Sequence, residues 1–187
     1  SDVYKRQLPN SIELIGGENI VVKNCQLGAQ PTGITCKVQE VNKLSFINNQ
    51  VYPDGRENLV LDACNNCVIE GNNFKSYYNG ILVLNGNDNT VNKNIFWLTG
   101  AVQNQLLDHG DDFGIINVKG NNNMVASNSL SCEWAYAGAV TVNAVQGTGN
   151  VFKNCFVDNL ESYRVFLVNA QTEVSNCVSS DKVSIVE

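Results

Sequence analysis

The stretch VKGNNNMVASNSL, residues 118–130, places three consecutive asparagines between two short apolar segments. The same phrase recurs along the chain as an apolar run, a turn of glycine and asparagine, and a second apolar run containing another asparagine. The copies begin at Ile12, Ile34, Leu59, Ile81, Ile115, Val140 and Val165. One asparagine marks each copy, and these markers are Asn24, Asn49, Asn72, Asn94, Asn128, Asn154 and Asn176. The chain therefore contains an internal repeat.

The length and composition of the repeat predict the architecture. Successive markers are 25, 23, 22, 34, 26 and 22 residues apart, so one interval is long and the others match one structural turn each. Each copy contains short alternating runs of Val, Ile, Leu and Phe that are typical of strand, turn, strand, turn, and none has the periodicity of a helix. A unit this short cannot bury its apolar face alone, so the copies must stack. We predict an all-β parallel β-helix, a solenoid of about seven coils.

Leucine-rich repeats are the competing solenoid, because their period overlaps and they also place asparagine before an apolar residue. They require the pattern L-x-x-L-x-L before the asparagine and a helix or 3₁₀ turn after it. Here glycine and asparagine turns precede the marker and a second apolar run follows it. The parallel β-helix is the favoured interpretation.

The 29 asparagines of the chain are expected to be mainly architectural. Asparagine tolerates left-handed backbone angles and bonds neighbouring backbone groups, which suits the corners of a coil. Asparagines stacked at one corner can also bond each other as a ladder, with each bond contributing about 1 kcal/mol. We therefore expect the Asn-Asn-Asn run to build a corner rather than a catalytic site.

Composition excludes several classes of partner. With 43% apolar and 16% charged residues, the chain is expected to fold. Its 12 basic and 18 acidic residues give a net charge of −6 without a basic cluster, so nucleic acid and anionic membranes are not expected partners. No apolar run approaches the roughly 18 residues of a membrane span.

The seven cysteines are spread along the chain, and an odd number does not suit a complete disulfide framework. Most are expected to be buried thiols. Cys64 and Cys67 form a C-x-x-C, but no second pair or histidine cluster accompanies them, so we predict neither a metal site nor a redox site there.

Stacked coils bring equivalent residues to a spacing of about 4.8 Å, which would suit a pair of sugar-processing carboxylates. The outward position of the first strand is predicted to hold Glu13, Thr35, Val60, Leu82, Ile116, Thr141 and Phe166, without an adjacent acidic pair. Four of these form an apolar stripe that either a loop or another subunit would cover. The stripe contains Val60, Leu82, Ile116 and Phe166.

The long interval, WLTGAVQNQLLDHGDDFG, adds about ten residues and is a candidate binding loop. It carries the single histidine, His109, with Asp108, Asp111 and Asp112, and a carboxylate beside histidine can position an acid/base group. A solvated turn with capping aspartates is the alternative. Glu133 and Trp134, followed by Tyr136, form a second acidic and aromatic loop that could stack sugars or pack against an edge.

The segment DDFGIINVKGNNNMVASNSL, residues 111–130, resembles the inulin fructotransferase family, glycoside hydrolase family 91. The resemblance extends over residues 8–178 and implies a right-handed parallel β-helix that assembles as a homotrimer, here through the apolar stripe. It further implies release of difructose anhydride from inulin, or hydrolysis of that anhydride, with fructan or difructose anhydride as the partner and without a metal or organic cofactor. Asp111 and Asp112 match the family motif and are expected to help build a substrate pocket.

The resemblance places the catalytic Asp and Glu of the family before Leu8, so neither can be assigned to a residue of this chain. The first seven residues, SDVYKRQ, resemble a translated sequencing adapter, which leaves residues 8–187 as one β-helix domain that is truncated at its N-terminus. We therefore expect this chain to be an inactive, aggregation-prone fragment of a fructan-processing enzyme. The alternatives are a pectate-lyase-like enzyme, which would need calcium ligands and a basic residue, and a non-catalytic adhesin or spike module.

Overall fold

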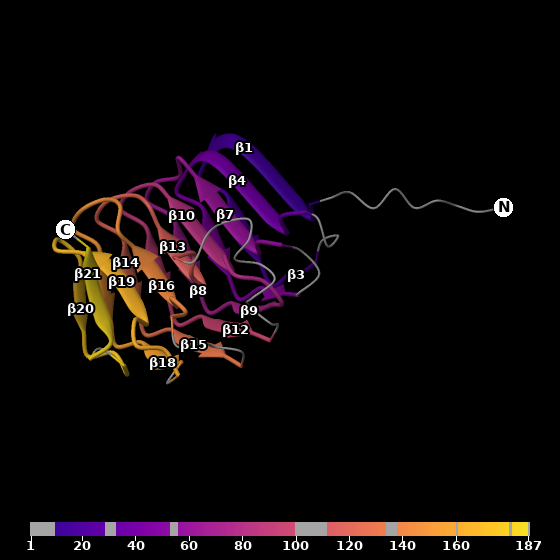
Figure 1. Cartoon of the computed structure of the whole chain (residues 1–187). Coiled ribbons are helices and arrows are strands. Elements are labelled where there is room, and N and C mark those ends of the chain that lie inside the picture. Colours follow the sequence, from indigo (N-terminus) through magenta and orange to yellow (C-terminus); the bar gives the residue numbers. More distant parts are fainter. Residues whose placement is uncertain are drawn as a thin grey trace.

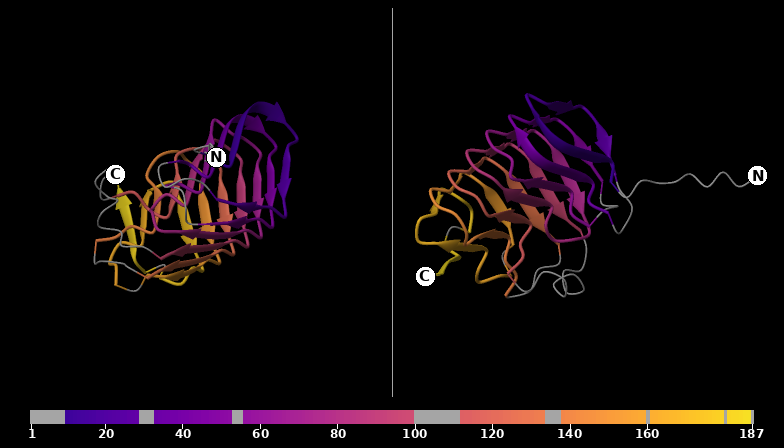
Figure 2. Two further views of the ribbon diagram at one scale, coloured as in Figure 1. Left: turned by 90° about the vertical axis from the view of Figure 1, so that its right-hand side faces the viewer. Right: turned by 90° about the horizontal axis from the view of Figure 1, so that it is seen from above.

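The chain folds into stacked coils of three strands each. The computed structural model describes residues 10–28, 33–52, 56–99, 112–133, 138–159, 161–179 and 181–186. Within these residues every regular element is a β-strand, and the strands form three parallel sheets of eight, seven and six strands. The coils follow one another along a single axis, from the indigo N-terminal coil to the yellow C-terminal coil (Figures 1 and 2). The expected parallel β-helix is confirmed.

Each sheet takes one strand from each coil. The first sheet contains β1 (Ile12–Glu18), β4 (Cys36–Asn42), β7 (Leu59–Asp62), β10 (Leu82–Asn85), β13 (Ile116–Val118), β16 (Val142–Ala144), β19 (Phe166–Asn169) and β21 (Val183–Val186). The second contains β2 (Val21–Lys23), β5 (Ser45–Ile47), β8 (Val68–Glu70), β11 (Thr90–Asn92), β14 (Met124–Ala126), β17 (Val151–Lys153) and β20 (Glu173–Ser175). The third contains β3 (Gln26–Leu27), β6 (Gln50–Val51), β9 (Asn73–Ser76), β12 (Ile95–Leu98), β15 (Ser129–Cys132) and β18 (Phe156–Asp158).

Six coils are complete and a seventh contributes β19 and β20, in agreement with the seven repeats of the sequence. Each complete coil has three strands, whereas the sequence predicted two strands for each repeat. The second apolar run of each repeat bends at a residue in the left-handed region, for example Lys93 with φ 54°, and so divides into two strands. Among the described residues, no helix is long and apolar enough to cross a membrane.

The core is a set of inward-facing columns along the axis. Phe46 of the second sheet and Phe74 and Phe96 of the third sheet stack on successive coils, with ring centroids 6.1 and 5.0 Å apart. All three rings are at most 1% exposed. Because equivalent residues repeat at every coil, each coil buries its apolar face against its two neighbours.

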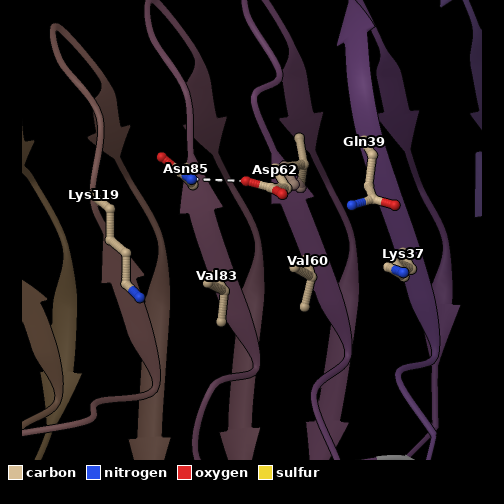
Figure 3. A pocket seen from close by; sticks show the side chains of 8 residues that line it. Lys37, Gln39, Val60, Asp62, Val83, Asn85 and Lys119 are labelled. Carbon is tan, nitrogen blue, oxygen red and sulfur yellow. Dashed lines mark hydrogen bonds between the residues drawn. The ribbon is translucent and has the colours of Figure 1, made fainter. Parts of the chain in front are cut away.

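The register of the first sheet corrects the expected apolar stripe. Leu82, Ile116 and Phe166 are 0% exposed and point into the core. Val60 points outward and is aligned with Lys37 and Val83 on the neighbouring strands (Figure 3). Since side chains alternate along a strand, an alignment that is wrong by one residue exchanges the two faces. The stripe is therefore wrong as a surface, and with it the predicted subunit contact.

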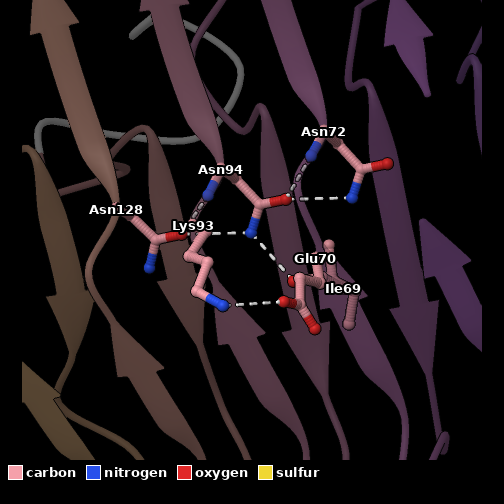
Figure 4. A network of polar contacts seen from close by, with 6 residues as sticks. All are labelled: Ile69, Glu70, Asn72, Lys93, Asn94 and Asn128. Carbon is pink, nitrogen blue, oxygen red and sulfur yellow. Dashed lines mark hydrogen bonds and ion pairs between the residues drawn. The ribbon is translucent and has the colours of Figure 1, made fainter. Parts of the chain in front are cut away.

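One buried asparagine ladder runs between the second and third sheets, through Asn49, Asn72, Asn94 and Asn128. Figure 4 shows its last three members. The side-chain oxygen of Asn94 accepts from both the backbone N–H and the side-chain amide of Asn72, each at 2.9 Å. The amide of Asn94 donates in turn to Asn128 at 3.0 Å and to the carbonyl of Ile69 at 2.8 Å. The ladder satisfies buried backbone groups where the chain turns.

Three of the expected markers lie one position before the ladder. Asn24, Asn154 and Asn176 have φ values of 57°, 55° and 52° and occupy the left-handed corner. The residues that follow them, Cys25, Cys155 and Cys177, take the ladder position. The backbone N–H of Cys25 donates to Asn49 at 3.0 Å, and that of Cys155 donates to the sulfur of Cys177 at 3.5 Å.

The three asparagines at residues 121–123 each have a different structural role. The amide of Asn121 donates to Asn87 on the preceding coil at 3.0 Å. Asn122 adopts φ 53°, and Asn123 belongs to a second buried ladder with Asn89 and Asn150. The structural role predicted for this run is therefore confirmed.

Backbones pack directly against each other at the same corner. A Cβ atom on Gly86 would lie 1.8 Å from the carbonyl oxygen of Cys64, and one on Gly120 would lie 1.7 Å from that of Gly86. Glycine is required there because the coils approach too closely for any side chain.

Candidate functional site

The outer face of the first sheet carries a shallow pocket of about 170 Å³ that opens to solvent (Figure 3). It spans β4, β7 and β10 and ends at the residue that follows β13. Its lining consists of outward side chains from two aligned rows, together with the backbone between them. The lining residues are Lys37, Gln39, Val60, Leu61, Asp62, Val83, Asn85 and Lys119.

Apolar and polar groups are separated within this pocket. Val60 and Val83 are adjacent on β7 and β10 and form an apolar floor. Two residues further along these strands, Asn85 donates from its side-chain amide to the carboxylate of Asp62 at 2.7 Å. This bond fixes the orientation of both groups at the rim and leaves the second carboxylate oxygen of Asp62 as an acceptor.

Lysines stand at the two ends of the pocket. Lys37 lies on β4 and pairs with Glu13 of β1 at 3.4 Å, with both side chains partly exposed. Lys119 lies three strands away, which corresponds to about 14 Å at the usual strand spacing. The pocket therefore has uncharged and acidic groups at its centre and a cation at either end.

Part of this outer face beyond the pocket is covered. Asn117 and Leu167 occupy the same outward row as Val83, yet they are only 3% and 5% exposed. The side chain of Asn117 bonds both the N–H and the carbonyl of Gly114, at 2.9 and 2.8 Å. The residues that precede β13 thus fold back over the sheet, and the open part of the face lies on its N-terminal coils.

A polar cluster connects the residues just before β13 to the next two coils. Asp112 pairs with Arg164 at 2.7 Å, and its carbonyl accepts from the side chain of Asn143 at 2.8 Å. Arg164 also donates to the carbonyl of Gly138 at 2.8 Å. Asp112 therefore anchors the end of the long interval, and its carboxylate is engaged by a cation.

Glu133 lies elsewhere, on the third-sheet side. Its carboxylate accepts from the indole N–H of Trp97 at 2.9 Å, and the Lys75 ammonium lies 4.2 Å from the centre of the same ring. One face of the indole is thus occupied by a cation, which makes it a poor platform for stacking a sugar. The other sequence candidates, Asp108, His109, Asp111 and Trp134, lie outside the described residues.

The sequence analysis missed every residue of the pocket except Val60. The alternation of side chains in the first strand of each repeat could have found the pocket. It required aligning Val60 with Val83 on the next coil, instead of with Leu82. That register places Val60 and Asp62 on one side, followed by Val83 and Asn85 on the next coil.

Paired carboxylates are absent from the part of this outer face that the structure describes. Glu13 and Asp62 lie two strands apart and two residues out of alignment, which corresponds to about 12 Å at the usual spacings. Sugar hydrolysis by two carboxyl groups requires them about 5 to 10 Å apart across one bond. The described pocket can hold a ligand, and its residues do not include a neighbouring acid pair.

Stacked three-strand coils define a β-solenoid, and this one carries an open, polar-rimmed pocket on its outer face. The chain belongs to the family described as periplasmic copper-binding protein (NosD), which it matches over residues 1–176. None of the curated proteins compared with the chain gives a significant match.

Several solved structures share the fold, as the resemblance in the sequence predicted. DFA-IIIase from Arthrobacter chlorophenolicus A6 without its lid has 19% identity and a TM-score of 0.76, over 96% of this chain and 53% of that one. The same enzyme in complex with GF2 has 19% identity and a TM-score of 0.71, over 92% and 46%. In complex with DFA-III the values are 21% and 0.68, over 92% and 48%. The chain spans about half the length of these proteins.

The described residues do not fit the copper site that the family description implies. They contain no group of three or more His, Cys, Asp or Glu side chains that could hold a metal ion. Burial raises the pKa of the Cys36 thiol to about 12 and that of Cys67 to about 11, which disfavours the thiolate form that binds metals. Cys64 is also buried and its pKa is raised by burial, so the C-x-x-C is part of the core.

Proposed function

We propose that the chain is part of a fructan-processing protein and that the pocket on the outer face of the first sheet holds the saccharide. The pocket itself is the observation that carries this proposal, because it combines an apolar floor with oriented hydrogen-bonding groups. The fold shared with the DFA-IIIase structures supports it. Fructan, or the difructose anhydride released from it, is the proposed ligand.

The chemistry of the pocket suits a small neutral saccharide. A sugar ring presents C–H groups on its faces and hydroxyl groups around its edge, so a floor of Val60 and Val83 with polar groups at the rim complements it. The carboxylate of Asp62 can accept from a hydroxyl, while Gln39 can both donate and accept. Open access from solvent leaves room for a longer chain to extend beyond the pocket.

Binding without turnover is expected of the described residues. A hydrolase or transferase of this kind would draw its acid pair from elsewhere in a longer protein, in accord with the resemblance, which places that pair before Leu8. The proposed role of this chain is therefore to position the saccharide on the solenoid.

Calorimetric titration with short inulin oligosaccharides and with a difructose anhydride tests the proposal. Asp62→Ala and Asn85→Ala should each weaken binding by about tenfold, which corresponds to about 1.4 kcal/mol. Asn92→Ala is the matched control, because Asn92 lies half-buried on β11 of the second sheet, away from the pocket. The control should leave the affinity unchanged.

Two results would contradict the proposal. Absence of saccharide binding by a folded chain would remove the pocket from consideration. Binding of polygalacturonate in preference to fructan would assign the site to an acidic saccharide held by Lys37 and Lys119, as in the pectate-lyase-like alternative.

A further inference from the structure

Two cysteines occupy the position of the ladder asparagine on successive coils. β17 and β20 are paired in parallel with Lys153 opposite Ser175, and Cys155 and Cys177 each follow two residues later. The backbone keeps the same alignment beyond the strands, because the N–H of Val178 donates to the carbonyl of Cys155 at 3.0 Å. The two thiols are therefore equivalent groups on adjacent coils.

Their sulfur atoms lie in the same interior column. The backbone N–H of Cys155 donates to the sulfur of Cys177 at 3.5 Å, in place of the amide oxygen found in the ladder. Parallel strands bring aligned Cα atoms to about 4.8 Å. Disulfides form between Cα atoms about 4.4 to 6.8 Å apart, so a bond between these sulfurs does not require the coils to move apart.

Cys25, Cys36 and Cys67 have no cysteine at the equivalent position of the next coil. The ladder neighbour of Cys25 on the next coil is Asn49, and Cys36 lies between Ile12 and Leu59 on the paired strands. Cys67 donates its backbone N–H to Asn89 of the following coil. Cys155 and Cys177 differ from these three thiols because they occupy equivalent positions on adjacent coils.

We propose that Cys155 and Cys177 form a redox-active dithiol that closes to a disulfide between the sixth and seventh coils. The site lies at the C-terminal end of the second sheet, whose last strand is β20. Cys155 and Cys177 are only 3% and 6% exposed, so the oxidant reaches them when the seventh coil opens locally at the end of the stack. A glutathione-type disulfide is the class of oxidant required.

The reaction proceeds by two thiol–disulfide exchanges. The Cys155 thiol donates to Cys177 and lowers the pKa of the Cys177 thiol to about 7, while the pKa of Cys155 is raised. The Cys177 thiolate attacks one sulfur of the oxidant and displaces one glutathione thiolate. Cys155 then gives its proton to water, attacks the Cys177 sulfur and displaces the second thiolate. Two S–H groups become one S–S bond, and one oxidant disulfide becomes two thiols.

The bond would lock the seventh coil to the sixth. It joins cysteines 22 positions apart, and such a crosslink restricts the unfolded chain more than the folded one. Oxidation should therefore raise the urea midpoint of unfolding, and dithiothreitol should return it to the starting value.

The test is mass spectrometry on the intact, fully reduced chain after exposure to oxidised glutathione. We expect the loss of two of the seven thiols, a mass decrease of two hydrogens, and a proteolytic fragment that joins the peptides of Cys155 and Cys177. Cys155→Ser and Cys177→Ser should each prevent this bond. Cys64→Ser is the control and should leave it intact.

The wild-type chain decides the proposal even if a serine variant fails to fold. Retention of all seven thiols in the folded, oxidant-treated chain would overturn it. A stable glutathione adduct on Cys177, without a bond to Cys155, would overturn it as well, since the second exchange would then not occur. A bond between any other two cysteines would have the same consequence.

Discussion

The asparagine side chain explains the chemistry of the coil corners residue by residue. Its carbonyl oxygen accepts from the backbone N–H of the preceding coil while its amide donates to the following one, as at Asn94. Aspartate lacks the donor, and leucine lacks both groups. A buried corner therefore favours asparagine, because its short side chain offers an acceptor to one neighbouring coil and a donor to the other.

Asn94→Ala should destabilise the chain by roughly 2 to 4 kcal/mol. The substitution removes the acceptor for the backbone and side-chain donors of Asn72, both of which are buried, and an unsatisfied buried group costs about 1 to 3 kcal/mol. Urea denaturation followed by circular dichroism measures the change. Asn92→Ala, two residues earlier on the outer face, should cost less than about 0.5 kcal/mol. Equal effects of the two substitutions would show that the ladder does not stabilise the fold.

At the scale of the strand, the alternation of side chains decides which residues line the pocket and which face the core. Leu82 and Val83 are consecutive residues of β10, but the first is 0% exposed and the second lines the pocket. The same relation holds for Leu61 and Asp62 at the end of β7, where the carboxylate projects outward. The strands β4, β7 and β10 therefore have one face packed in the core, and their opposite face lines the pocket.

Leu82→Asp and Val83→Asp provide a paired test of this orientation. Leu82→Asp buries a charge between Leu59 and Ile116 and should destabilise the chain by roughly 4 kcal/mol or more. Val83→Asp places its charge at the pocket surface and should cost less than roughly 1 kcal/mol, while it weakens saccharide binding through loss of the apolar floor. Thermal unfolding and calorimetric titration report the two effects. A larger loss of stability from Val83→Asp would reverse the assigned faces.

The whole molecule is a one-dimensional stack in which the strands of each coil pair only with those of the neighbouring coils. Interior coils are covered on both sides, whereas β2 in the first coil has one half-buried and two exposed residues. In β11 of the fourth coil, the central valine is fully buried between half-buried neighbours. Local stability should therefore fall from the middle of the stack toward both ends.

Amide hydrogen exchange measures this gradient directly. Amides of β8, β11 and β14 should exchange more slowly than those of β2 and β20, because opening an interior coil breaks contacts on two sides. The slow group should also include the backbone N–H groups of Asn72 and Asn94, which the ladder holds. Uniform protection along the chain would indicate that the stack opens as one unit.

Much of the architecture could be predicted from the amino-acid sequence, but the candidate pocket could not. The repeat and its asparagines indicated stacked strands and a structural role for residues 121–123, and both are confirmed. The outward residues of the first sheet were misassigned because Leu82 and Val83 are both apolar, so composition does not distinguish the side that faces the core. Asp112 was predicted to help build a substrate pocket, and the sequence did not indicate its pairing with Arg164, because the two residues are 52 positions apart.

The sequence by itself determined that this chain is a stacked β-solenoid, because a short repeat with alternating apolar residues can bury its surface only against copies of itself. Only the tertiary structure decided which face of each strand is exposed to solvent, since a shift of one residue exchanges the faces without altering the repeat. That choice brings Asp62 beside Asn85 over a floor of valines. It also brings Cys155 beside Cys177, because coil stacking places residues 22 positions apart in direct contact.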